Sequence, residues 1–347
     1  MHHIAVDAMG GDHAPESIVR GISSLFDESL GFSFHLYGDK DLIFPLLEKH
    51  NLPSSDPRLH VFHAPGVIAS DAKPSYALRN SANTSMRLAI EAVQTNQCQA
   101  VLSGGNTGAY MGLCKVILKT LPGINRPALA GLLPTLEDRC VMLDVGANID
   151  STPEQLVQFS VFGRAYAACM LDRIAPTVGI LNIGTEDIKG NEILRTTRSL
   201  LKGVLPKAIF RGFVEGNEVF AGAADVVVTD GFNGNVAIKS AEGAIKLMRI
   251  HLQRSLTTSW LSCICAYFLR SSIKTLTQKL DPRSYNGAPL LGLRYLAVKS
   301  HGGADYKAFA NALHITMRLM TKGIISSLEN SLKKDLLSHS QDTSTMA

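Results

Sequence analysis

The chain of 347 residues has no cysteine pair with CxxC spacing, no apolar run long enough to span a bilayer, and little net charge. Its six cysteines are scattered, which argues against a disulfide framework or a zinc site and indicates a reduced, cytosolic chain. Crossing a bilayer takes about 20 consecutive apolar residues, so a membrane-spanning protein is excluded. The net charge of +4 is too small to indicate a nucleic-acid-binding protein.

The short motifs of several enzyme classes are missing as well. GxGxxG does not occur at the first turn, and Walker A, GxSxG and HExxH are absent. These absences argue against a dinucleotide site, a nucleotide-binding phosphate loop, a serine hydrolase and a zinc protease. No cysteine lies in a glycine-rich elbow, so a thiol nucleophile is not expected. We therefore expect neither a cofactor nor a metal.

The chain does contain many glycines, and its apolar strand-like runs alternate with segments of helical period. The 29 glycines and 46% hydrophobic residues are typical of an α/β protein with a sizeable core. Continuous apolar strands between helices favour a mostly parallel sheet covered on both faces. We predict a doubly wound α/β fold forming one domain over residues 1–335, with a disordered tail at 336–347. The expected strands include residues 32–37, 100–102, 128–133, 141–145, 178–183, 208–214, 225–228 and 294–298.

Residues 246–283 interrupt this alternation. They show no strand pattern, only two helical stretches around an apolar tip at residues 260–269, which begins with the one tryptophan, Trp260. The tip is too short to cross a membrane, so we predict a helical hairpin that projects from the domain. Basic residues flank the tip, against the single acid Asp281: Lys246, Arg249, Arg254, Arg270, Lys274, Lys279 and Arg283.

Glycine-rich turns follow five of the expected strands. The first turn, residues 7–12, follows a short apolar strand at residues 4–6; its two glycines stand between two aspartates, and a helical pattern follows Pro15. The others are residues 103–109, 144–148, 181–190 and 229–235. Each turn taken alone is typical of an ordinary loop. In a doubly wound sheet, however, the carboxyl ends of the strands converge on one cleft.

Together the turns supply the groups that bind an oxyanion. They carry backbone N–H groups, amide side chains, carboxylates and one lysine, Lys189. This set suits a phosphate ion and the negative charge that develops in an acyl-transfer intermediate. His301 follows a strand and precedes a helix, so it either lines the same cleft or is an ordinary surface histidine.

These motifs resemble those of the acyl-carrier-protein:phosphate acyltransferases of bacterial phospholipid synthesis. The chain departs from that family's pattern at Gly104, where alanine is usual, at Asn233, where threonine is common, and around Glu186, where the family is more acidic. The tail beyond Ser338 lies outside the match. Eight blocks match in order and spacing: residues 7–12, 71–79, 103–109, 144–148, 182–190, 230–239, 285–294 and 299–302.

The resemblance implies that inorganic phosphate attacks the thioester of a long-chain acyl-carrier protein, giving acyl phosphate and free carrier protein. It also implies a homodimer with a fold like that of phosphotransacetylases and isopropylmalate dehydrogenases. A membrane acyltransferase would then use the acyl phosphate to acylate glycerol 3-phosphate. Phosphate is itself the nucleophile, so this chemistry needs a cation for the dianion and donors for the tetrahedral oxyanion rather than a serine or cysteine.

Within this chemistry we expect Lys189 to hold phosphate and Asn235 to donate to the oxyanion. His301, or a water molecule, would protonate the leaving thiolate. Asn106 and Thr107 are expected to line a phosphate nest. The aspartates among the remaining positions are expected to orient the backbone and the lysine rather than to move protons. The other expected substrate-binding positions are Asp7, Gly10, Gly11, Asp12, Ser103, Asn148 and Asp230.

The basic hairpin has three interpretations. Its apolar tip can enter the headgroup region while lysine and arginine meet anionic lipid, which suits delivery of acyl phosphate to a membrane enzyme. It can instead be a subunit or lobe contact, or the surface that receives the acidic carrier protein. The first interpretation predicts a cytoplasmic protein, since no signal-peptide pattern is present, that is associated peripherally with the inner face of the cell membrane. The expected membrane contacts are Trp260, Leu261, Ile264 and Phe268.

Two other functions stay open at this point. One is a short-chain phosphotransacetylase that uses acyl-coenzyme A, although a soluble donor gives no reason for a basic apolar hairpin. The other is a non-catalytic, membrane-docked module that binds acyl chains. A pure binding module has no use for oxyanion donors at five strand ends, which argues against it.

Overall fold

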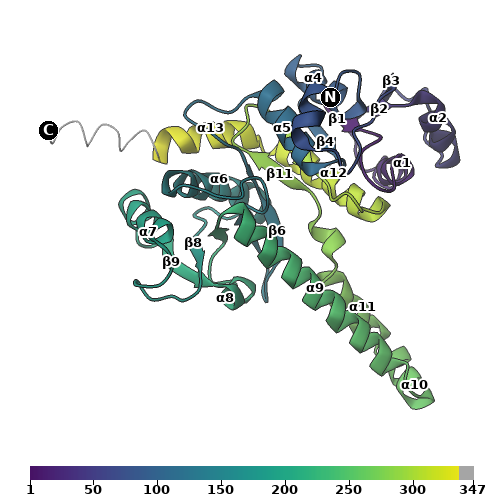
Figure 1. The fold of residues 1–347 in the computed structure, drawn as a ribbon. Helices are drawn as coiled ribbons and strands as arrows, with labels where there is room; N and C mark the ends of the chain where they lie inside the picture. The colour runs from purple at the N-terminus through teal and green to yellow at the C-terminus, as the bar shows by residue number, and fades with distance from the viewer. Residues whose placement is uncertain (336–347) are drawn as a thin grey trace.

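The computed structural model describes residues 1–335, and their strands form two sheets in two adjacent lobes (Figure 1). The predicted disordered tail at 336–347 lies outside the described residues. In the order given next, the first five strands of the first sheet run parallel to one another. The sixth, β11, runs antiparallel to both of its neighbours. The order of this sheet is β3 (Leu59–His63), β2 (Phe32–Gly38), β1 (His2–Asp7), β4 (Ala100–Ser103), β12 (Leu296–Lys299), β11 (Ala288–Leu291) and β5 (Ala128–Leu129).

The second sheet is also mostly parallel, with β6 antiparallel at its edge. Its order is β6 (Gly131–Pro134), β7 (Arg139–Leu143), β10 (Val226–Val228), β8 (Val178–Asn182) and β9 (Phe210–Glu215). The helices are α1 (Glu16–Ser23), α2 (Lys40–Lys49), α3 (Pro74–Arg79), α4 (Ser85–Gln94), α5 (Thr107–Leu118), α6 (Pro153–Leu171), α7 (Glu192–Val204), α8 (Gly216–Ala221), α9 (Gly231–Leu256), α10 (Trp260–Phe268), α11 (Arg270–Lys279), the 3₁₀ turn η1 (Pro282–Tyr285), α12 (Tyr306–Thr321) and α13 (Ile324–Asp335).

The α/β class with mostly parallel strands is confirmed, but the strands divide between two sheets instead of forming one. The division falls within the apolar run 128–133, which the sequence analysis treats as a single strand. At Ala130 the chain leaves β5, and the Ala130 N–H donates to the Pro289 carbonyl at 3.0 Å before β6 begins in the other sheet. Strands β3 and β11 are additional to the predicted strands. Pro289 lies within β11, and a proline weakens a strand pattern because it cannot donate to the ladder.

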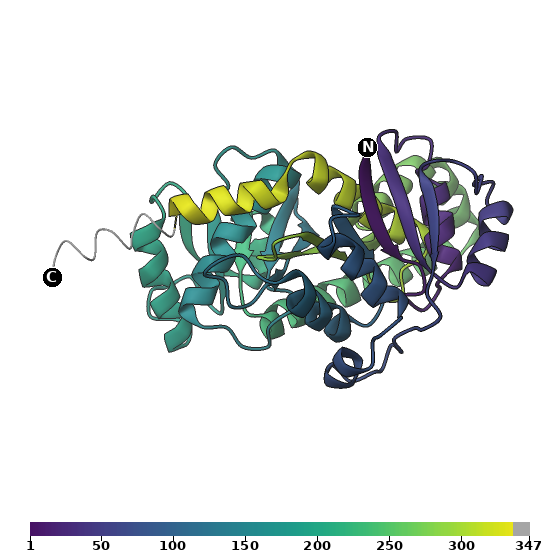
Figure 2. The same cartoon turned by 90° about the horizontal axis from the view of Figure 1, so that it is seen from above.

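Both faces of the first sheet are covered, as a doubly wound fold requires. Along β1, Ile4 and Val6 pack into one core cluster, whereas Ala5, between them, packs into the other. Helix α6 belongs to the second lobe, on the side of the yellow C-terminal helix in Figure 2, and is buried along most of its length, including Phe159, Phe162 and Tyr166. It packs against β7, β10, α7, α12 and α13, which explains why apolar residues occupy most of its surface.

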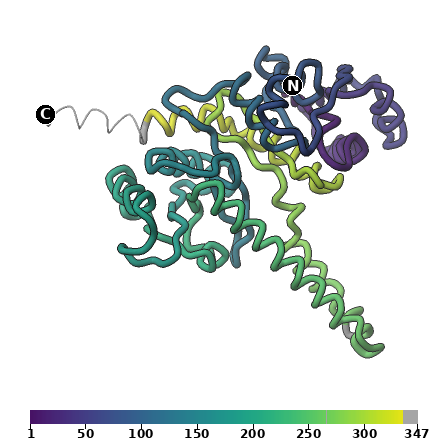
Figure 3. Tube along the Cα trace, viewed as in Figure 1, coloured from purple at the N-terminus to yellow at the C-terminus, as the bar shows by residue number. Residues whose placement is uncertain are grey.

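The predicted hairpin projects from the molecule and is built from α9, α10 and α11 (Figures 1 and 3). We call residues 246–283 the arm. Helix α9 begins far earlier than the predicted hairpin, directly after its N-cap Asp230, whose carboxylate accepts from the Asn233 N–H. One continuous helix therefore runs from the fifth glycine turn into the arm and ends at Leu256, before the tip. Among the described residues, the structure has no helix long and apolar enough to span a membrane.

Candidate active site

Three glycine-containing loops meet in the first lobe, because β1, β4 and β12 are parallel neighbours whose carboxyl ends share one edge. The Asp12 N–H donates to the Gly302 carbonyl at 2.8 Å. A Cβ atom on Gly104 would lie 2.7 Å from the Gly10 carbonyl oxygen, and one on Gly11 would lie 3.0 Å from the Gly302 oxygen. Gly11 also has a φ of 120°, which favours glycine. Glycine at these positions thus lets three backbones pack together.

Beneath these loops lies the carboxylate of Asp7, which is fully buried. It accepts hydrogen bonds from the Ser85 and Ser103 hydroxyls, both at 2.6 Å. Burial raises the pKa of Asp7, while these hydrogen bonds and the Lys299 ammonium act in the opposite direction. Asp7 and Ser103 therefore hold these loops together, and the Ser103 hydroxyl also accepts the Gly105 N–H at 3.0 Å.

Lys299 is the residue that the sequence analysis missed. It ends β12, is only 5% exposed, and borders the cavity described below. Its ammonium donates to the Ser300 carbonyl. Burial lowers the pKa of Lys299 to about 8, although Asp7 and Asp12 partly oppose this shift. A signal was available, since Lys299 is a charged residue at the end of an apolar strand and opens the matching block 299–302.

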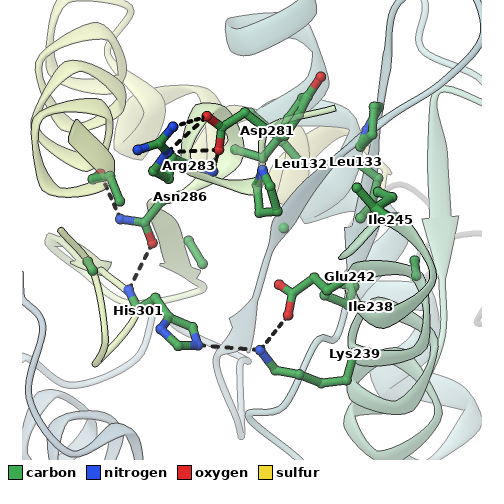
Figure 4. Close-up of a pocket in the computed structure, with 18 of the residues that line it drawn as sticks. Leu132, Leu133, Ile238, Lys239, Glu242, Ile245, Asp281, Arg283, Asn286 and His301 are labelled. Atoms are coloured by element: carbon green, nitrogen blue, oxygen red, sulfur yellow. Dashed lines mark hydrogen bonds and ion pairs between the residues drawn. The ribbon is translucent and has the colours of Figure 1, made fainter. Parts of the chain in front are cut away.

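His301 is held in a defined orientation beside Lys299. Its backbone N–H donates to the Asn286 Oδ1 at 2.8 Å, and its ring Nδ1 accepts the Gly303 N–H at 3.1 Å. Because Nδ1 accepts, we assign the ring proton to Nε2, which lies 3.4 Å from the Lys239 Nζ (Figure 4). Burial and then the Lys239 ammonium lower the pKa of His301, so the ring is neutral at pH 7.

In the second lobe, the turns after β7 and β10 meet in the same way. The Gly231 N–H donates to the Asn148 carbonyl at 2.7 Å, and the buried Asp144 carboxylate accepts from the Asn148 N–H at 2.6 Å. The Asn148 amide donates to the Asp144 Oδ2 and to the Pro127 carbonyl, so it braces these loops. The Asn235 amide donates to the Val145 carbonyl at 3.3 Å and faces the cleft.

A cavity of about 820 Å³ lies between the two groups of turns. Its polar end is formed by Lys299, His301 and Lys239, with Thr107 and Asn235 at its wall. From there a mostly apolar channel, whose lining also includes Arg249, Asp281 and Arg283, follows β6 and one face of α9 to the base of the arm. The apolar residues along it include Leu132, Leu133, Ile238, Ile245, Met248, Leu252, Leu276 and Leu280.

Comparison with known proteins decides the family. The model of a family described as fatty acid synthesis protein matches residues 2–327. A phosphate acyltransferase of Rhodospirillum centenum is 45% identical over 331 residues, which cover 95% of this chain and 93% of that protein. The chain belongs to the phosphate acyltransferase family. A second member, from Nitrosococcus oceani, is 43% identical over 314 residues, or 90% of this chain and 92% of that protein. The chain is thus an acyltransferase of lipid biosynthesis.

Two solved structures confirm the phosphotransacetylase-like fold. A phosphotransacetylase from Streptococcus pyogenes superposes with a TM-score of 0.62 at 18% identity, covering 92% of this chain and 94% of that one. The EutD phosphotransacetylase from Staphylococcus aureus has a TM-score of 0.60 at 16% identity, covering 91% and 93%. At such identities the likeness concerns the fold alone.

Within this phosphate acyltransferase, the predicted site residues do not all meet. His301, Asn235 and Thr107 line the cavity. Lys189 does not line it, because its side chain is exposed on the loop between β8 and α7. The Asn106 amide donates to the Ser70 and Ala72 carbonyls and its oxygen caps α5, so its hydrogen bonds are used within the chain.

The remaining predicted positions surround the cavity without lining it. Asp230 is engaged with Asn233 at the start of α9, and Asp12 is exposed at the first turn. Asp7, Ser103 and Asn148 support the loops from below, as described above. Whether any of these residues contacts substrate stays a prediction.

Proposed function

We propose that the chain transfers a long acyl group from acyl-carrier protein to inorganic phosphate, forming acyl phosphate and free carrier protein. The observation that supports this proposal is the shape of the cavity. Its cationic end, with Lys299 and Lys239, suits a phosphate dianion, and its apolar channel toward Leu252 suits an alkyl chain. A short-chain donor would leave that channel empty.

The residues suggest how the reaction proceeds. Phosphate held beside Lys299 attacks the thioester carbonyl carbon, and the Asn235 amide donates to the oxyanion that forms. When the tetrahedral intermediate collapses, the C–S bond breaks and the sulfur leaves as thiolate. The Nε2–H of neutral His301 is placed to donate a hydrogen bond to that thiolate, which takes its proton from water. Lys299 takes the role that the sequence assigned to Lys189, because Lys299 borders the cavity.

The test is phosphate-dependent release of carrier-protein thiol from palmitoyl-carrier protein, compared with palmitoyl-coenzyme A and acetyl-coenzyme A. We expect rapid release with the carrier-protein donor and little with the others. Preference for acetyl-coenzyme A would make the chain a short-chain phosphotransacetylase. Absence of thiol release from every donor would favour the acyl-binding module.

We also propose that the arm docks on an anionic membrane surface. Its tip exposes Trp260 by 71%, Leu261 by 57% and Phe268 by 78%. Exposed aromatic and aliphatic groups of this kind, flanked by basic residues, are typical of interfacial anchors. Ile264, the fourth predicted contact, is also exposed. The homodimer and the downstream membrane acyltransferase stay predictions from the resemblance.

Co-sedimentation with vesicles tests the arm. The double variant Trp260→Ala/Phe268→Ala should lose most binding to phosphatidylglycerol vesicles, because the two most exposed apolar side chains of the tip are removed. The matched control is Leu42→Ala/Phe44→Ala on α2, two exposed apolar residues on the other lobe. Undiminished binding of the arm variant, or equal loss in the control, would contradict this docking.

A further inference from the structure

Lys239 and Glu242 lie opposite His301, on the other wall of the cavity (Figure 4). Both belong to α9 of the second lobe, whereas His301 follows β12 of the first lobe. The Lys239 Nζ lies 2.7 Å from the Glu242 Oε2 and 3.4 Å from the His301 Nε2. All three residues line the cavity, and the two α9 side chains are half-exposed to it.

The contact between Lys239 and His301 brings two donors together. An ammonium group has no acceptor, and the His301 Nε2 carries the ring proton because Nδ1 already accepts from Gly303. Two donors at 3.4 Å do not bond to each other, so each must find an acceptor elsewhere. Glu242 supplies an acceptor for Lys239, but among the described residues no acceptor is hydrogen-bonded to the His301 Nε2–H.

An oxyanion placed between these two nitrogens would satisfy both donors at once. Phosphate carries several acceptor oxygens and a larger negative charge than a carboxylate. The Lys239–Glu242 pair is separated by three residues on an exposed helix face, and ion pairs of this kind contribute little to stability. Phosphate can therefore replace Glu242 without breaking a strong contact.

We propose that Lys239 is a phosphate-binding residue and that Glu242 occupies its ammonium until phosphate arrives. This inference rests on the proposed function, because it names the phosphate subsite of the same cavity. Lys239 from the second lobe and Lys299 from the first then hold the anion from two sides. Glu242 acts as a built-in competitor that weakens the affinity for phosphate and leaves the affinity for the acyl donor unchanged.

Calorimetric titration of the whole protein with inorganic phosphate tests the proposal without any turnover. Glu242→Gln should bind phosphate about three- to tenfold more tightly, since the competitor loses its charge, and Lys239→Met should bind it about tenfold more weakly. Lys239→Arg should restore most of the binding. The control Glu91→Gln removes a carboxylate from a comparable helix pair with Arg87, away from the cavity, and should change nothing.

The pKa of His301, followed by NMR, gives a second readout that a structural role alone would not move. The charged groups acting on this ring are Lys239, Glu242, Lys299 and Asp12. Lys239→Met should raise the pKa of His301, and Glu242→Gln should lower it. Saturating phosphate should raise it in both the wild type and Glu242→Gln.

Failure of this inference is distinguishable from failure of the proposed function. Unchanged or weaker phosphate binding by Glu242→Gln, or unchanged binding by Lys239→Met, overturns the inference even if the wild type turns over palmitoyl-carrier protein. Absence of phosphate binding to the wild type overturns it as well. Tighter binding by Glu242→Gln in a protein that releases no thiol supports the phosphate subsite and contradicts the proposed function.

Discussion

Replacing Lys299 with methionine should lower phosphate-dependent turnover by about 10³-fold while the protein still folds. The ammonium is the buried cation at the polar end of the cavity, and the variant removes its attraction for both phosphate and the developing oxyanion. Methionine has a similar length and suits a buried position, so the packing around β12 is preserved. Steady-state kinetics with palmitoyl-carrier protein and a thermal melt measure the two effects separately.

The matched control for this prediction is Lys189→Met. Lys189 is exposed on its loop and does not line the cavity, so its loss should cost far less activity. A larger loss at Lys189 than at Lys299 would contradict our assignment. It would show that the β8 loop reaches the phosphate during turnover, as the sequence analysis expected.

The lowered pKa of Lys299 predicts that phosphate binding depends on pH. Burial lowers the pKa of Lys299 to about 8, so its ammonium is present below that pH and is lost as the pH rises through it. An ordinary lysine stays charged to about pH 10. Phosphate affinity of the wild type should therefore decline above pH 8. The phosphate affinity of Lys299→Met, measured by the same titration across this pH range, should lack this decline.

Filling the apolar channel should change which donors are used. Ile245 lines the cavity from α9, one turn beyond Glu242, and Ile245→Trp would add a large ring where we place the alkyl chain. Turnover of palmitoyl-carrier protein should fall by about 10²-fold, whereas a four-carbon donor should react nearly as in the wild type. Thiol release from a series of acyl-carrier proteins of increasing chain length measures the change.

Leu247→Trp is the control for this variant. Leu247 lies on the same helix two residues away, is 58% exposed, and does not line the cavity. It should leave the chain-length profile unchanged. Equal losses for all donors with Ile245→Trp would mean that the channel does not hold the acyl chain.

Much of the fold could be predicted because local signals agree with it. Each predicted apolar run overlaps a strand, and the glycine turns stand at the carboxyl ends of parallel strands, since period and turn chemistry are local properties. The division into two sheets was not predictable from such signals. It depends on which strands pair, and β5 stays in the first sheet because Leu129 pairs with Leu290, a residue far away in the sequence.

The features of the site likewise fall into those that the sequence indicated and those that only the tertiary structure decided. The sequence alone indicated the α/β class, the family by resemblance and the projecting arm, and it named His301, Asn235 and Thr107 as candidates for the site, because motifs and hydrophobic period are written in neighbouring positions. Only the tertiary structure decided which lysine borders the cavity, Lys299 or Lys189. Burial, a lowered pKa and the meeting of α9 with the β12 loop arise from packing between segments distant in the chain, and no local pattern records them.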